Sequence, residues 1–473
     1  MTRLVVGPFN RVEGDLEITL DVDDGVIAAA RVNAPLFRGF EQILVGRPPA
    51  DALAVVPRIC GICSVGQSAA AASALADAMG LQATPNGLLA RQLIQATENL
   101  ADHLSHFYLF FMPDFARPAY AGRPWYDAVA RRFAAVKGSA AADVLPARAN
   151  FLKLMGFLAG KWPHTLALQP GGSTRAPTSA ERIRVLALLR DFRSFVETVV
   201  LGDDLENFAT LDSADGLAAW ADGRTGDFPA FLATAADLGL DRIGRGSDRF
   251  LAYGAYGLFP AGLWQAGGAS TPLDPGAISE DTRHAWLAAG KPRHPAVGET
   301  VVDADNPDGY TWCKAPRYDG TVAEVGALAR QAVAGHPLAR DMIERHGASV
   351  SARVVARLLE LASVLPAMEG WVKAMVPGEA FCAHASLPDE CQGAGLVEAA
   401  RGSLGHWLSV RRGRIDRYQI IAPTTWNFSP RDAADRPGPL EQALVGLPAG
   451  PNAPPTVQHV VRSFDPCMVC TVH

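Results

Sequence analysis

The sequence predicts a mainly α-helical protein with small β elements, which is an α+β fold class. Three observations lead to this prediction. Long stretches in the middle of the chain carry apolar residues at helical spacing. Short apolar runs that flank turn residues occur near each end and indicate β-hairpins there. The chain has 473 residues, of which 49 % are hydrophobic and 19 % charged, so it can bury a large core.

The first β element is expected within the first forty residues. Leu16–Val22 and Val26–Val32 are apolar runs separated by a short turn that ends at Gly25. A glycine at this place can adopt the positive φ angle that a tight hairpin turn requires. We therefore expect a β-rich segment at residues 1–50.

A mainly helical body is expected at residues 51–400. Ala-rich composition or an apolar stripe marks four helices: Ser68–Met79, Leu88–Met112, Ile183–Val200 and Val350–Met375. Thr178 and Glu181 have the spacing of a capping box and indicate where the third helix begins. Pro366 is expected to kink the fourth helix, because proline removes a backbone donor.

The end of the chain returns to strand character. Trp407–Val410 and Arg414–Ile421 flank a turn at Gly413, so residues 401–473 are expected to form a hairpin followed by a tail. No change in composition marks a domain boundary, and we interpret residues 1–473 as one domain. The longest uncharged run, Phe250–Leu273, contains too many Gly and Pro residues for a membrane-spanning helix.

Charge and cysteine usage exclude some classes of protein. A net charge of −6 and a pI of about 6.0 argue against a nucleic-acid partner. The N-terminal residues show neither a long apolar segment nor a twin-arginine pair, so no export signal is expected. The seven cysteines are unevenly spread, which favours thiols or metal ligands over a disulfide framework.

Two CxxC pairs lie at opposite ends of the chain, Cys60 with Cys63 and Cys467 with Cys470. Four thiolates suit Zn, Fe or Ni. From spacing alone, a structural zinc site or an iron–sulfur cluster ranks ahead of a nickel–iron centre, and a redox-active pair fits less well. However, the two halves of a zinc ribbon normally lie within one small module.

The segments around these pairs resemble the large subunits of nickel–iron hydrogenases, and the resemblance covers nearly the whole chain. Seven segments carry it: Arg11–Gly14, Phe37–Glu41, Arg58–Cys63, Lys314–Tyr318, Arg401–Trp407, Pro423–Asn427 and Ser463–His473. Each short segment alone is weak. Seven in the right order, ending with a CxxC beside a C-terminal His, are specific and favour nickel–iron over zinc.

The resemblance implies a fold in which long helices surround a central metal site that joins the two ends of the chain. It implies that Cys60, Cys63, Cys467 and Cys470 all hold nickel. Cys63 and Cys470 would also bridge to iron, which would carry one CO and two cyanide ligands. The implied reaction is heterolytic cleavage of H2.

Further roles follow from the same resemblance. Arg401 and Thr424 would donate hydrogen bonds to the cyanides. Glu13 would relay protons beside a cysteine that binds nickel alone. Asp114 and Asp465 would lie close to Arg401 above the metals. Taken alone, Glu13 would be interpreted as a surface carboxylate and Arg401 as a structural ion-pair partner.

A magnesium ion and a partner are also implied. Glu41 and His473 would support Mg2+ between the two ends of the chain. The chain has too few spare cysteines for several clusters, so a small subunit with Fe–S clusters is expected. Cys313, Cys382 and Cys391 are interpreted as buried, inert thiols. His103 and His106 are interpreted as helix-packing or hydrogen-bonding residues.

Departures from the common family pattern indicate the regulatory, hydrogen-sensing branch. Gln67 stands where most members have His. Ile62 and Phe110 are bulkier than the usual residues, and core packing explains them about as well as a narrowed gas path. The absence of residues after His473 is also typical of that branch. We therefore expect a cytoplasmic H2 sensor of low turnover that signals through a histidine kinase.

Three alternatives remain. The first is an energy-converting uptake hydrogenase, which has the same chemistry and feeds an electron-transport chain. The second is a relative in a quinone-linked proton-pumping complex, and the four cysteines argue against it because that group lacks them. The third is a zinc-stapled structural subunit.

Overall fold

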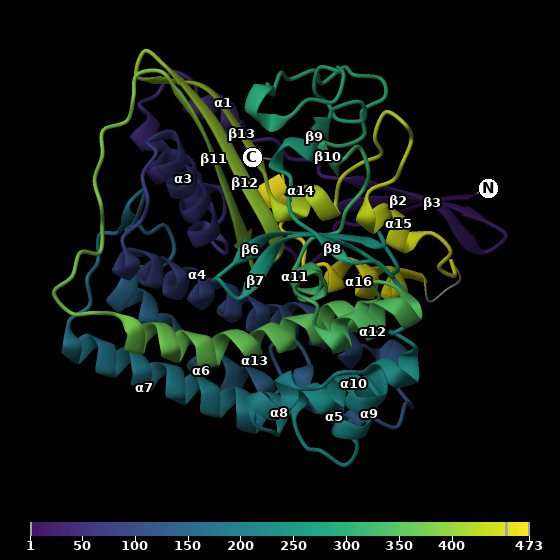
Figure 1. The fold of residues 1–473 in the computed structure, drawn as a ribbon. Coiled ribbons are helices and arrows are strands. Elements are labelled where there is room, and N and C mark those ends of the chain that lie inside the picture. Colours follow the sequence, from purple (N-terminus) through teal and green to yellow (C-terminus); the bar gives the residue numbers. More distant parts are fainter. Residues whose placement is uncertain (1, 450–452, 472–473) are drawn as a thin grey trace.

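The computed structural model describes residues 2–449 and 453–471. Its long helices lie side by side in the lower half of Figure 1, with the small antiparallel sheets above them. Short helices lie both among the sheets and at the lower right. The long helices are α4 (Pro85–Ser105), α6 (Ala140–Ala159), α7 (Ser179–Phe195) and α13 (Val350–Ala374). The predicted class, mainly helical with small β elements, is confirmed.

The ends of these helices follow the signals in the sequence. The Thr84 side chain accepts a hydrogen bond from the Gly87 backbone N–H and caps α4. The predicted capping box of Thr178 and Glu181 is present at the start of α7. The helix expected at Leu88–Met112 is α4 as far as Ser105, and then widens into a π-helical segment, η3 (His106–Phe111).

The predicted N-terminal hairpin is confirmed. It comprises β2 (Glu17–Asp23) and β3 (Val26–Asn33), with Leu20 opposite Ala30, and β1 (Thr2–Val6) pairs with the outer edge of β2. Gly25 has a φ of 76°, as the turn requires.

The predicted C-terminal hairpin is also present, as β12 (Gly402–Arg411) and β13 (Arg414–Ile421). A third strand, β11 (Cys391–Ala399), pairs with β12 and was not predicted from the sequence. This strand lies against α3 (Ser64–Ala78) (Figure 1). A Cβ atom at Gly395 would lie 2.0 Å from the Ala70 carbonyl oxygen, so this contact requires a glycine.

The remaining elements fill the space between these layers. The other strands are β4 (Leu168–Gln169), β5 (Gly172–Ser173), β6 (Arg249–Ala255), β7 (Phe259–Gln265), β8 (Ser270–Thr271), β9 (Ile278–Asp281) and β10 (Ala315–Tyr318). The other helices are α1 (Phe40–Leu44), α2 (Ala52–Val55), α5 (Tyr126–Phe133), α8 (Leu205–Ala209), α9 (Ala214–Ala221), α10 (Asp227–Leu238), α11 (Ala327–Ala334), α12 (Pro337–His346), α14 (Pro423–Asn427), α15 (Pro439–Leu444), α16 (Ala453–Ser463) and α17 (Met468–Thr471). Within the described part of the chain, no helix combines the length and the apolar character needed to cross a bilayer.

The two ends of the chain meet in the interior. Glu13 forms a parallel β-bridge with Cys467, and the Met468 N–H donates to the Glu13 carbonyl oxygen over 2.7 Å. The Ile27 N–H likewise donates to the Leu447 carbonyl oxygen over 2.9 Å. These contacts bring the N-terminal β segment next to the C-terminal tail.

Candidate metal centre

The short helices and loops around each CxxC pair direct its two cysteines toward the same point. Cys60 follows the 3-10 helix η2 (Val56–Ile59), and Cys63 immediately precedes α3. In the other pair, Cys470 lies within the short helix α17. The Arg38 guanidinium donates to the Ile59 carbonyl oxygen over 2.6 Å and also to the Val469 carbonyl oxygen. One cation therefore ties the two cysteine loops together.

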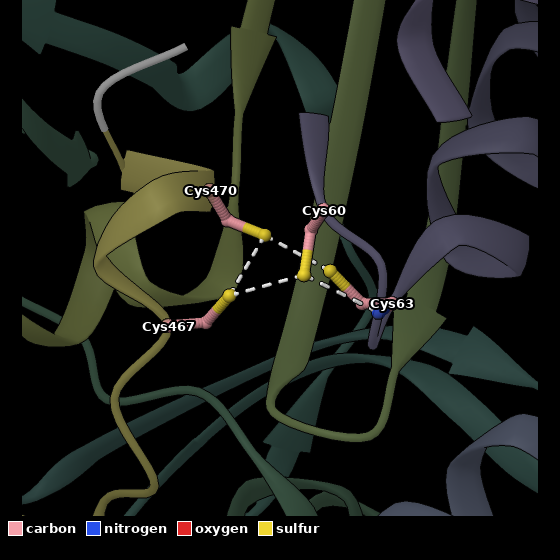
Figure 2. Close-up of side chains that lie close together, drawn as sticks. All are labelled: Cys60, Cys63, Cys467 and Cys470. Carbon is pink, nitrogen blue, oxygen red and sulfur yellow. Dashed lines mark hydrogen bonds between the residues drawn. The ribbon is translucent and has the colours of Figure 1, made fainter. Parts of the chain in front are cut away.

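The four sulfur atoms converge in the interior (Figure 2). The Sγ atoms of Cys63 and Cys470 lie 2.9 Å apart, those of Cys60 and Cys467 3.4 Å apart, and those of Cys467 and Cys470 3.1 Å apart. All four lie within 4.8 Å of one another, and all four residues are buried. The structure thus brings together the four cysteines that the sequence analysis proposed as ligands.

This donor set fits a soft or borderline metal. Hydrogen bonds from Cys467, Cys470 and Cys63 lower the pKa of the Cys60 thiol, whereas burial raises the pKa of Cys470. Because thiolates this close repel one another in a dry interior, a bound cation is needed to hold several of them deprotonated. Four such sulfurs are suitable ligands for nickel, iron or zinc.

Arg401 is buried on the turn between β11 and β12, and two carboxylates hold its guanidinium. Its Nη2 lies 3.0 Å from Asp465 Oδ1 and 3.2 Å from Asp102 Oδ1, and its Nε donates to the Asp465 carbonyl oxygen over 2.8 Å. Although burial opposes it, the charges of Asp102 and Asp465 raise the pKa of Arg401. Arg401 therefore carries a fixed positive charge beside the C-terminal segment that contains Cys467 and Cys470.

Asp114 does not lie where the sequence analysis expected it, and this prediction is wrong. Its carboxylate accepts hydrogen bonds from Arg11, from Arg117 over 2.6 Å and from Arg462 over 2.6 Å. After η3, the short helix η4 (Met112–Ala116) directs Asp114 toward α16. Asp102 takes the expected place beside Arg401 because it lies on the face of α4 turned toward the metal site. Asp102 could have been noticed in the sequence, because it is a charged residue within a helical segment that carries an apolar stripe.

Glu13 lies next to the metal site through its backbone bridge to Cys467. Its side chain is half-buried. Burial and the nearby Cys60 thiol raise the pKa of the Glu13 carboxyl. A carboxyl with a raised pKa can hold and release a proton closer to neutral pH.

Thr424 is also at the site. Its hydroxyl oxygen accepts a hydrogen bond from the Cys467 N–H over 3.1 Å. Because this contact uses only the oxygen, the hydroxyl proton can be donated to another group.

Sequence reasoning missed a chain of polar side chains behind the metal site. The Gln67 amide nitrogen lies 4.0 Å from Cys470 Sγ, and its amide oxygen lies 2.8 Å from His406 Nε2. His406 Nδ1 in turn lies 2.8 Å from the Tyr418 hydroxyl. The sequence does contain a signal, because Gln67 departs from the family pattern. Its partners became visible only when α3 and the C-terminal sheet packed together.

The expected magnesium ligands are only partly within the described residues, because His473 lies outside them. Glu41 is buried, and Lys314 Nζ lies 3.0 Å from its Oε1. The Thr300 hydroxyl and the Ile420 N–H also donate to this carboxylate. Lys314 Nζ also lies 3.5 Å from Glu280 Oε1, so its charge is shared between two buried carboxylates. The magnesium ligands Glu41 and His473 therefore stay a prediction.

The remaining thiols and histidines have structural surroundings. His106 Nε2 lies 2.6 Å from the Arg462 carbonyl oxygen, and His103 Nε2 lies 3.3 Å from Glu360 Oε1. Of the other thiols, only Cys313 is buried. Cys382 and Cys391 are half-exposed, which corrects the expectation that all three are buried. They lie on a surface loop and at the start of an edge strand. Ile62 and Phe110 are half-buried.

Comparisons with known proteins define the class of this chain. A family model described as nickel-dependent hydrogenase matches residues 38–122 and 141–473. The periplasmic [NiFeSe] hydrogenase large subunit of Desulfomicrobium baculatum is 30 % identical, over 100 % of this chain and 95 % of the relative. The uptake hydrogenase large subunit of Rubrivivax gelatinosus is 26 % identical over the same shares.

A solved structure agrees with these matches. The reduced Ni-Fe-Se hydrogenase of Desulfovibrio vulgaris Hildenborough superposes with a TM-score of 0.85 at 30 % identity, with 100 % of both chains covered. The chain belongs to the nickel-dependent hydrogenase family. It has the large-subunit fold of that family, as the resemblance predicted, and it is a hydrogenase.

Proposed function

We propose that this chain is the large subunit of a nickel–iron hydrogenase and cleaves H2 heterolytically. One observation carries the proposal: four buried sulfurs from the two ends of the chain converge within 4.8 Å. A family model covering most of the chain supports nickel as the metal rather than zinc. A structural subunit with zinc at the same four cysteines is therefore the less favoured interpretation.

The proposed cofactor is a nickel–iron centre with one CO and two cyanide ligands, held by the four cysteines. When bound, this centre supplies the chemistry that splits H2. The Glu13 carboxyl receives the proton, because its raised pKa makes it a better proton acceptor than an ordinary exposed carboxylate. Arg401 places a permanent positive charge at the site, and the Thr424 hydroxyl proton is available to a cyanide nitrogen.

Electrons must leave through another chain. Beyond the four ligands the sequence has three cysteines, fewer than the four that an Fe–S cluster normally requires. We therefore propose a small subunit that contains Fe–S clusters. We also propose Mg2+ at Glu41 and His473, and no step of the reaction depends on it.

We infer a sensing role in preference to uptake, as a finer assignment. The supporting observation is Gln67, which connects Cys470 to His406 through an amide that does not titrate. As parts of this sensing role, we propose low turnover, a histidine kinase partner and a cytoplasmic location. The uptake alternative is favoured by relatives such as the Rubrivivax gelatinosus enzyme.

Infrared spectroscopy of the purified complex, together with elemental analysis, tests the proposal. Bands of metal-bound CO and cyanide that shift when H2 is added, with nickel and iron both present, are the expected result. One zinc per chain and no nickel would overturn it. High H2 turnover without a kinase complex would favour uptake over sensing.

A further inference from the structure

Arg330, on α11, uses every N–H of its guanidinium. The side chain is fully buried. Nε and Nη2 donate to Glu360 over 2.8 and 3.0 Å, and Nη1 donates to Glu398 over 2.6 Å. The two remaining N–H groups donate to the carbonyl oxygens of Ala399 and Ala400, each over 3.0 Å. A guanidinium has five N–H donors, and here all five are satisfied.

These two carbonyls belong to the residues immediately before Arg401. They lie where β11 ends and the chain turns into β12. Arg330 therefore holds the backbone of the turn that carries Arg401. Its anionic partner Glu398 is itself fixed, because the Tyr253 N–H and the Ser403 hydroxyl donate to Glu398 Oε1 over 2.7 and 2.6 Å.

A second route leads from Arg330 to the other side of Arg401. Glu360 lies on α13 and binds the guanidinium of Arg330. Glu360 Oε1, the oxygen that accepts from Arg330 Nη2, also lies 3.3 Å from Nε2 of His103 on α4. The preceding residue, Asp102, contacts Arg401 through an Nη1–Oδ2 distance of 3.1 Å. The same ion cluster thus contacts both the Arg401 turn and the helix that supplies its carboxylate partner.

We propose that Arg330 is a positioning residue that aims the Arg401 guanidinium at the metal site, with Glu360 and Glu398 as its anchors. The inference rests on the proposed function, because it assumes that Arg401 acts there. A lysine cannot replace Arg330, since an ammonium has three donors and no planar fork to span two carboxylates and two carbonyls.

Arg330→Lys in the purified complex tests this, with Arg317→Lys as the matched control. Arg317 is also buried and also makes five hydrogen bonds, to Asp432, Ser429, Pro316, Pro430 and Arg436, none of them at the Arg401 turn. Both variants should lower Tm. In a crystal structure, only Arg330→Lys should displace the Arg401 guanidinium from Asp465.

The kinetic readout separates positioning from general damage. Arg330→Lys should lower kcat by about 10- to 100-fold with KM for H2 and nickel content retained, as a small misplacement of a reacting group does. Arg317→Lys should keep kcat within about twofold. If Arg330→Lys fails to fold, Glu360→Gln is the second variant. It weakens the paired hydrogen bonds between Arg330 and Glu360 and should displace Arg401 in the same way.

Arg401 found in place with unchanged kcat in Arg330→Lys would overturn the inference, and so would an equal loss of kcat in Arg317→Lys. A wild-type complex that lacks nickel or does not react with H2 would instead contradict the proposed function. The position of Arg401 in the variant crystal still tests the inference in that case, because it does not depend on activity.

Discussion

The sulfur atoms of Cys63 and Cys470 lie 2.9 Å apart, although the two residues are 407 positions apart in the chain. This contact closes nearly the whole polypeptide into one loop. Ordering the C-terminal tail and building the metal site are therefore the same event, and Arg38 fastens the two cysteine loops from one side. Metal binding should stabilise this closure, because a bound metal contributes to folding free energy.

Removing one ligand should abolish metal loading. Cys63→Ser replaces a soft thiolate with a hard hydroxyl, so nickel measured by elemental analysis should fall from about one per chain to near zero. Cys391→Ser is the control, because Cys391 is half-exposed and lies outside the sulfur cluster. A Cys63→Ser protein with a full complement of nickel would show that this sulfur is not a ligand.

Neutralising Glu13 should stop proton transfer without loss of the metals. A glutamine at this place keeps the shape but cannot carry a proton. H/D exchange from D2 should therefore fall by about 10²- to 10⁴-fold. The infrared bands of the centre should persist. Asp15→Asn, at an exposed carboxylate two residues further on, should exchange like the wild type; equal losses in both variants would rule out a specific relay.

Asp114 should prove to be a stability residue. Asp114→Asn leaves the guanidinium groups of Arg11 and Arg462 without their shared anion, which should cost roughly 3 kcal/mol of unfolding free energy. His459 and these arginines overcome burial and lower the pKa of Asp114. The stabilisation is therefore present above the ordinary pKa of about 4 and is lost as the pH falls below it.

Chemical denaturation at several pH values measures this effect, and Asp102→Asn provides the contrast. Because Asp102 contacts Arg401, its variant should lose H2 turnover at full nickel content, whereas Asp114→Asn should lose stability first. The reverse pattern would restore the original expectation for Asp114.

Glu441 should make the protein less stable as the pH rises. Burial raises the pKa of this carboxyl from 4.5 to about 7, even though the Val32 N–H and the Tyr310 hydroxyl donate to it. The folded state therefore binds the proton more tightly than the unfolded state does. The resulting stabilisation is complete below pH 4.5 and is lost as the pH rises through about 7.

Glu441→Gln should remove this loss, which amounts to roughly 3 kcal/mol from a shift of about two and a half pKa units. The Tm of Glu441→Gln minus the Tm of the wild type should therefore be larger at pH 8 than at pH 5. Glu344→Gln, at an exposed position on α12, should show no such trend. A constant difference between Glu441→Gln and the wild type across this range would mean that Glu441 does not titrate there.

The sequence alone determined many of the local elements and the four cysteines that are the candidate metal ligands. The turn at Gly25, the capping box of Thr178 and the C-terminal hairpin follow from interactions between residues a few positions apart. The spacing of the two CxxC pairs likewise indicates metal binding. Such signals depend on short-range geometry, which a sequence displays directly.

Only the tertiary structure decided which buried charges meet. Asp102, not Asp114, faces Arg401, because the chain changes direction after η3 and turns Asp114 toward α16. The five hydrogen bonds of Arg330 join α11, α13 and β11, three elements that are separated along the sequence. Pairings of this kind depend on which faces of distant elements pack together, and neither periodicity nor spacing contains that information.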